Sequence, residues 1–234
     1  MDDFPTLSMT PTPTAQRPLL GLTVLGVEDS RFASDALRLM CLRLGARIRR
    51  ADSLASAERH LRVYRPTVVI IDIGLPDGSG LDLVETLAEA RPRPPVLLAT
   101  SGDATTRADA LSMGADGFIE KPATSLAAFQ TAILAHLPRE QHPAGPRSIP
   151  REDVKPDPIA LRDDMEHAAD LLDGDVAAET LAYVSQFVTG LCQWSGDTAL
   201  AQAAADLASP DKTATAIPRL RSLLGAHLAK PLAV

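Results

Sequence analysis

Between Leu19 and Pro138, short aliphatic runs alternate with stretches that have the apolar spacing of a helix. The strongest run, Val-Val-Ile-Ile directly before Asp72, is continuously apolar, which is typical of a parallel strand covered on both faces. The alternation predicts a doubly wound α/β domain with a five-stranded parallel sheet. The predicted strands are 22–27, 46–49, 67–71, 96–99 and 117–120, and the predicted helices are 32–44, 54–64, 81–90, 107–113 and 126–137.

The segments on either side of this domain differ from it in composition. Residues 1–18 are rich in Thr and Pro and have no apolar period, which predicts a disordered tail. Residues 139–157 contain four prolines and many charges, which is typical of an interdomain linker. The α/β domain is therefore expected to span residues 19–138.

After the linker, alanine is frequent and the β-branched runs stop, which predicts a small all-α domain of about four helices over 158–231. Asp157 followed by Pro158 is a good helix start. Trp194, near the end of the second predicted helix, is interpreted as a core anchor. The first three helices are predicted over 158–172, 176–194 and 197–208, and the last begins after Pro210 and Pro218 break the chain.

Polar side chains stand at the carboxyl ends of the predicted strands, where open α/β sheets bind their ligands. Three of them are carboxylates, which repel one another unless a cation joins them. A hard divalent ion such as Mg²⁺ suits such oxygen ligands, and the remaining Lys and hydroxyl groups can hold a phosphoryl group. The set consists of Glu28, Asp29, Asp72, Thr100, Ser101 and Lys121.

Four motifs resemble those of receiver domains of two-component response regulators. They are VEDS at 27–30, DIGLPDGSG at 72–80, LLATSG at 97–102 and GADGFIEKP at 114–122. The resemblance covers 19–138 and implies phosphorylation of Asp72 by a sensor histidine kinase or a histidine phosphotransfer protein. It further implies that Glu28, Asp29, Asp72 and the backbone carbonyl of Gly74 bind Mg²⁺ and that Lys121 is the family's invariant lysine.

The resemblance also implies a switch made of a hydroxyl group and an aromatic ring. Distance from Pro95 favours Thr100 as the switch hydroxyl, with Ser101 as the alternative, and Phe118 holds the aromatic position that turns inward on activation. The family usually has a cis peptide before the proline that matches Pro122. The positions that can shield the phosphoryl group or orient water are both glycines, at 74 and 102, so we expect a labile acyl phosphate.

The helical region gives few signs of an output activity. From residue 144 to 234 it carries eight Lys and Arg against thirteen Asp and Glu, and it contains no dense basic recognition helix, so we consider nucleic-acid binding unlikely. It has neither a glycine-rich phosphate loop nor a nucleophile turn, so no separate enzyme is expected. His227 and Lys230 resemble part of a histidine phosphotransfer motif, but Pro231 stands where that motif has Gly.

Two kinds of output follow for the helical region. The first is a protein-interaction module that responds to phosphorylation of the receiver, with homodimerisation as its simplest form. The alternative is a transcriptional response regulator with a divergent DNA-binding domain.

The remaining features concern location. No apolar run approaches the roughly 20 residues of a membrane span, and the N-terminus lacks a signal-peptide pattern. Cys41 and Cys192 lack metal-ligand spacing and are interpreted as small buried hydrophobes. A cytoplasmic protein without membrane contact is expected.

Overall fold

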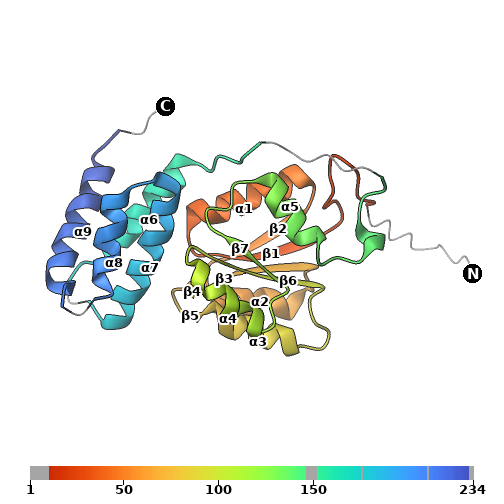
Figure 1. Cartoon of the computed structure of the whole chain (residues 1–234), viewed down its shortest axis with the longest axis horizontal. Helices are drawn as coiled ribbons and strands as arrows, with labels where there is room; N and C mark the ends of the chain where they lie inside the picture. The colour runs from red at the N-terminus through yellow and green to blue at the C-terminus, as the bar shows by residue number, and fades with distance from the viewer. Residues whose placement is uncertain (1–10, 146–151, 175, 210, 232–234) are drawn as a thin grey trace, which may run out of the picture.

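The computed structural model describes residues 11–145, 152–174, 176–209 and 211–231 and contains an α/β unit beside a group of helices (Figure 1). Residues 1–10 of the predicted disordered tail lie outside these ranges, as does part of the predicted linker, while residues 11–18 of the tail lie within them. Within the described ranges, no helix is both long enough and apolar enough to cross a membrane.

The sheet of the α/β unit has five parallel strands in the order β2-β1-β3-β6-β7, which confirms the predicted doubly wound fold. Its strands are β1 (Thr23–Val27), β2 (Arg47–Ala51), β3 (Val68–Asp72), β6 (Val96–Ser101) and β7 (Gly117–Glu120). The structure adds a short antiparallel pair after β3, formed by β4 (Gly74–Leu75) and β5 (Gly78–Ser79). This pair lies in the loop that follows Asp72.

Helices cover both faces of the sheet, with α1 and α5 on one face and α2, α3 and α4 on the other (Figure 1). Their bounds are α1 (Arg31–Leu44), α2 (Leu54–Val63), α3 (Gly80–Glu89), α4 (Arg107–Ser112) and α5 (Leu126–Leu134). Serine side chains accept a hydrogen bond from the first turn of four of them, which satisfies backbone donors that a helix leaves free. These N-cap residues are Ser30, Ser53, Ser79 and Ser125.

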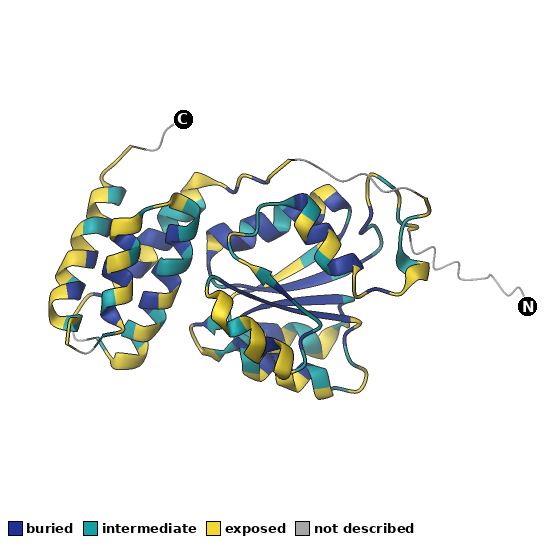
Figure 2. Ribbon diagram, in the orientation of Figure 1, coloured by how far each residue is buried: buried dark blue, intermediate teal, exposed yellow. Residues whose placement is uncertain are grey.

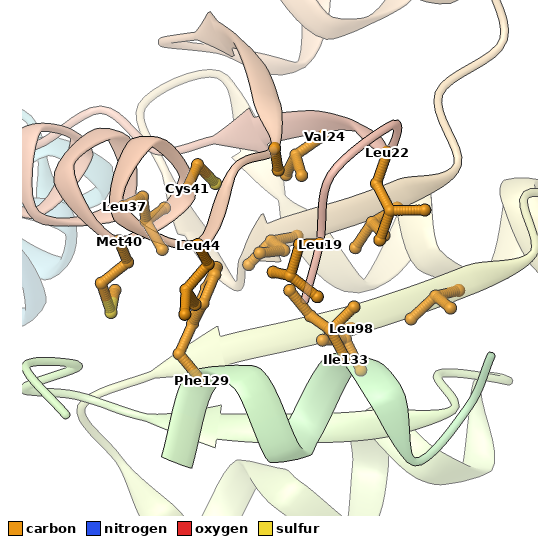
Figure 3. Close-up of a cluster of buried hydrophobic side chains, with 14 of the residues drawn as sticks. Leu19, Leu22, Val24, Leu37, Met40, Cys41, Leu44, Leu98, Phe129 and Ile133 are labelled. Carbon is orange, nitrogen blue, oxygen red and sulfur yellow. The ribbon is translucent and has the colours of Figure 1, made fainter. Parts of the chain in front are cut away.

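Two apolar cores lie on opposite faces of the sheet. The first joins β-strand residues to α1 and α5 and includes Leu98, Leu44 and Phe129 (Figure 3). The second joins the other face to α2, α3 and α4. Figure 2 shows that the central strands are buried along their length, as continuous apolar runs predict.

The C-terminal region has its own core, which explains how it forms a separate bundle. Its helices are α6 (Pro158–Leu171), α7 (Ala178–Ser195), α8 (Thr198–Leu207) and α9 (Thr213–Leu228), which confirms the predicted four-helix region. Asp157 caps α6 and Asp197 caps α8, each accepting from a backbone N–H.

Two sequence interpretations of this region need correction. Pro218 was predicted to break the chain, but it lies inside α9. Proline removes one helical hydrogen bond, and the burial of Ala216, Leu220 and Leu224 on the same helix compensates for that loss. Trp194 packs against the core of the α/β unit rather than anchoring the core of its own bundle.

The segment between the two regions is tied to the α/β unit. Val154 is buried in the first core, and its N–H donates to the Thr124 carbonyl oxygen at 2.9 Å. Asp153 forms a single β-bridge with Ser125. The chain is therefore attached to the α/β unit until a few residues before α6.

Candidate functional site at the carboxyl edge of the sheet

Three carboxylates gather at the carboxyl edge of the central strands. Glu28 and Asp29 follow β1 directly, and Asp72 is the last residue of β3. One oxygen from each lies within 4.8 Å of the others, so sequence reasoning correctly brought these residues together. Three oxygen donors at this spacing, with one partly exposed carboxylate, fit a hard divalent cation.

Lys121 lies between two of these acids. Its Nζ is 2.8 Å from Asp72 Oδ2 and 2.8 Å from Glu28 Oε2, and its side chain is only 10% exposed. The residue follows β7, where its N–H donates to the Ser101 carbonyl oxygen, and the Lys121–Pro122 peptide is cis as expected. One ammonium group therefore faces three carboxylates, which leaves the site with an excess of negative charge.

Burial and mutual repulsion shift the ionisation of this cluster. Burial raises the pKa of Glu28 well above its usual value, with Lys121 opposing and the neighbouring carboxylates adding to the rise. Burial and the charge of Asp72 raise the pKa of Asp29 to about 6. Burial alone would lower the pKa of Lys121, but Asp72 and Glu28 outweigh it and raise that pKa, so the lysine stays charged.

The two candidate switch hydroxyls occupy different positions. Thr100 is buried in β6, paired with Asp72 on one side and Ile119 on the other. Ser101, also buried, lines the same cavity as Asp72 and Lys121. The choice between the two remains a prediction.

The candidate switch aromatic, Phe118, lies in the second core, and the residue is 9% exposed. The Arg107 guanidinium stands 4.8 Å from the ring centroid and covers it from α4. Phe118 is already buried in this structure, and its movement on activation remains a prediction.

Gly74 and Gly102, the glycines expected to leave the site unshielded, are both approached by glutamines of α7. The Gly74 N–H is 3.4 Å from Asp72 Oδ1. A Cβ atom added at Gly74 would lie 2.5 Å from Gln186 Nε2, and one at Gly102 would lie 2.7 Å from Gln193 Nε2. Gln193 Nε2 also donates to the Gly102 carbonyl oxygen at 2.5 Å. The receiver has no side chain at these two glycine positions, and the side-chain amides of Gln186 and Gln193, from the helical region, lie there instead.

A buried carboxylate of α6, Asp164, binds the start of α1. It accepts from the Ser30 hydroxyl at 2.8 Å and from the N–H groups of Arg31 at 2.9 Å and Phe32 at 3.0 Å. Burial raises the pKa of Asp164, and these hydrogen bonds oppose the rise. An anion at a helix N-terminus is favourable because the first N–H groups lack partners and the helix dipole is positive there.

Tyr183 of α7 reaches the carboxylate cluster itself. Its hydroxyl donates to Asp29 Oδ2 at 2.5 Å, and burial together with the Asp29 charge raises the tyrosine pKa. Sequence reasoning missed Tyr183, Gln186, Gln193 and Asp164. One sequence pattern could have indicated the α7 residues. Besides its apolar face, α7 has a second face on which residues recur three or four positions apart: Tyr183, Gln186, Gly190 and Gln193.

The comparisons with known proteins identify the α/β unit. Residues 24–133 match the family model described as the response regulator receiver domain. The chain is 37% identical over 102 residues to TcrX of Mycobacterium tuberculosis, named as a probable transcriptional regulatory protein, covering 43% of this chain and 44% of TcrX. It is 30% identical over 99 residues to the transcriptional regulatory protein KdpE of Escherichia coli, covering 42% of this chain and 44% of KdpE.

These matches span less than half the length of either curated relative. Among solved structures, the response regulator TrrA of Thermotoga maritima, in complex with Mg²⁺ and BeF, is similar with a TM-score of 0.45 and 20% identity. That similarity covers 50% of this chain and 99% of TrrA.

Proposed function

Because residues 24–133 form a response regulator receiver domain of two-component signalling, followed by a helical region of unidentified family, we propose that this chain accepts a phosphoryl group on Asp72 and changes its protein contacts in response. The position of Lys121 between Asp72 and Glu28, beside a third carboxylate, is the observation that carries the proposal. The buried Lys121 ammonium lies beside the Asp72 carboxylate, so its positive charge can offset the negative charge of a phosphoryl group that approaches this carboxylate.

In the proposed transfer, an Asp72 carboxylate oxygen attacks the phosphorus of a phosphohistidine in a sensor histidine kinase or histidine phosphotransfer protein. The P–N bond breaks as the P–O bond forms, and the imidazole leaves with the bonding electron pair and takes up a proton. The product is an aspartyl phosphate.

The neighbouring residues stabilise the charge that arrives. Lys121 is close enough to the Asp72 carboxylate to pair with a phosphoryl oxygen attached to it. Thr100 or Ser101 would donate a hydroxyl hydrogen to another oxygen. Glu28, Asp29, Asp72 and the Gly74 carbonyl would hold Mg²⁺, which supplies charge neutralisation when bound.

For the output we propose a protein-interaction module without a separate enzyme activity. Support comes from the charge of residues 144–234, which carry eight Lys and Arg against thirteen Asp and Glu and thus disfavour a polyanion. The names of the curated relatives favour DNA binding as the second candidate. Binding to duplex DNA that weakens steeply with salt would support that candidate.

The phosphoacceptor is tested by incubating the protein with a small phosphodonor and Mg²⁺ and measuring the intact mass. We expect wild type to gain one phosphoryl group and Asp72→Asn to gain none. Asp77→Asn is the matched control, because Asp77 lies in the same loop but binds the N-terminus of α2 through Leu54 and Ala55. Labelling of Asp72→Asn at the wild-type level would contradict the assignment.

The cation site is tested by thermal denaturation with Mg²⁺ or EDTA. Mg²⁺ should raise the melting temperature of wild type, because it relieves repulsion among the carboxylates. Asp29→Ala should remove this response. A wild-type melting temperature that is the same in Mg²⁺ and in EDTA would contradict the metal assignment.

A further inference from the structure

Asp72 lies beneath α7. Together with Lys121 it lines a cavity of about 30 Å³, which has room for one or two water molecules. A phosphoryl group adds phosphorus and three oxygens, and its donor histidine must stand behind it. Neither fits while α7 keeps this position. The side chains and backbone that α7 contributes to the cavity belong to Gln186, Phe187, Gly190, Leu191 and Trp194.

The opposite side of the site is more open. Two grooves of about 570 Å³ and 530 Å³ reach Asp29, and the second also reaches Glu28. Asp72 and Lys121 are not among the residues that line these two grooves. A cation can therefore approach the acidic pair from the side, whereas the direction from which a phosphodonor must approach Asp72 is blocked.

We propose that the helical region is an intramolecular cap on the phosphoacceptor. Asp72 becomes phosphorylated only after α7 leaves the carboxyl edge of the sheet, and the phosphoryl group then prevents α7 from returning. The inference rests on the proposed function, since it concerns access to that same aspartate. Coupling of this kind is reciprocal: whatever weakens the cap favours phosphorylation, and phosphorylation weakens the cap to the same degree.

The contacts that hold the cap are suited to breaking and forming again. Several of them are polar: the Asp164 carboxylate at the start of α1, the Tyr183 hydroxyl on Asp29, and the Gln193 amide on the Gly102 carbonyl. The helical region keeps a separate apolar core, so it can move as a unit. Figure 1 shows α6 and α7 as the helices of this region nearest the receiver, and α8 and α9 on the side away from it.

The single tryptophan of the chain reports directly on this contact. The Trp194 ring packs edge-on against Phe32 of α1, with ring centroids 5.0 Å apart and an interplanar angle of 81°. Release of α7 would expose the indole to water. We expect Mg²⁺ with beryllofluoride, which mimics the phosphoryl group on Asp72, to shift Trp194 emission to longer wavelength.

Two test variants change residues of α7 and leave the receiver's own residues unaltered. Tyr183→Phe removes the hydrogen bond to the partly exposed Asp29 carboxylate and should speed labelling of Asp72 by a small phosphodonor about tenfold or more. Tyr64→Phe is the matched control, because Tyr64, the only other tyrosine, lies at the end of α2 and should label at the wild-type rate. A Cβ atom at Gly190 would meet nothing within 4 Å, so the conflict in Gly190→Leu would come from the further carbons of leucine, which must enter a cavity of about 30 Å³. Because leucine also improves helix propensity, we expect this variant to speed labelling with the bundle intact.

The outcomes separate this inference from the function on which it rests. Faster labelling of Tyr183→Phe and Gly190→Leu, together with the emission shift, would support the cap. Wild-type labelling rates in both variants and unchanged Trp194 emission on beryllofluoride binding would overturn the cap but leave the receiver function standing. Absence of labelling in wild type and in every variant would overturn the proposed function, and the cap with it.

Discussion

The raised pKa of Asp29 predicts how the free energy of unfolding depends on pH, in both direction and size. Its pKa rises from 3.8 to about 6, first because of burial and then because of the charge of Asp72. The folded protein therefore holds this proton to higher pH than the unfolded chain, and stability falls as pH rises from about 4 to about 6. A shift of about 2 units corresponds to about 3 kcal/mol against the ionised form in the folded state.

Asp29→Asn removes the charge and keeps an oxygen that can accept from Tyr183. At about pH 7.5 in EDTA we expect the variant to unfold with a free energy about 1–3 kcal/mol higher than wild type. At about pH 4 the gain should largely disappear, because the wild-type carboxyl is then protonated when folded. Urea denaturation followed by circular dichroism at both pH values measures the difference.

Glu85→Gln provides the matched control, since Glu85 is an exposed carboxylate on α3 outside the site. It should change the free energy of unfolding by less than about 0.5 kcal/mol at either pH. An Asp29→Asn variant that is no more stable than wild type at neutral pH would refute the reasoning. An equal gain at both pH values would refute it as well, because the effect would not come from ionisation.

Two further predictions concern the rest of the site. Lys121→Met leaves two buried carboxylates without their ammonium partner, so urea denaturation at neutral pH should show a loss of about 3 kcal/mol or more, and a smaller loss in acid. Thr100→Ala and Ser101→Ala should both still take phosphate in an intact-mass assay, but only the variant that lacks the switch hydroxyl should lose beryllofluoride-induced changes in hydrogen exchange around Phe118. Equal changes in both variants would show that neither hydroxyl acts as the switch.

The receiver could be predicted from sequence because its signals are local. The apolar run 68–71 leads directly into Asp72, and the acidic pair directly follows β1, so the parallel strands bring these residues to one edge of the sheet. The observed strands differ from the predicted ones by at most two residues at either end. The carboxylate cluster and its lysine followed from the same pattern.

The contact between the two regions could not be predicted in this way. Ser30 and Asp164 are 134 residues apart, and an ordinary carboxylate on an amphipathic helix carries no sign of its distant partner. Tyr183 and the α7 glutamines are likewise common residue types whose role depends on where the helix comes to lie. Pro218 was misjudged because helix-breaking tendency is local, while the burial that stabilises α9 is not.

Val154 determines how far the helical region can travel. With that side chain held in the receiver's first core and α6 beginning at Pro158, only residues 155–157 separate the two anchored parts, and of these Asp157 donates its N–H to Asp35 of α1 at 3.3 Å. Three residues extend to about 10 Å at most, so a released bundle stays at a high effective concentration beside the sheet. A released bundle can therefore move only a short distance from the sheet. Once Asp72 has lost its phosphoryl group, a few modest contacts are enough to hold the bundle on the sheet again.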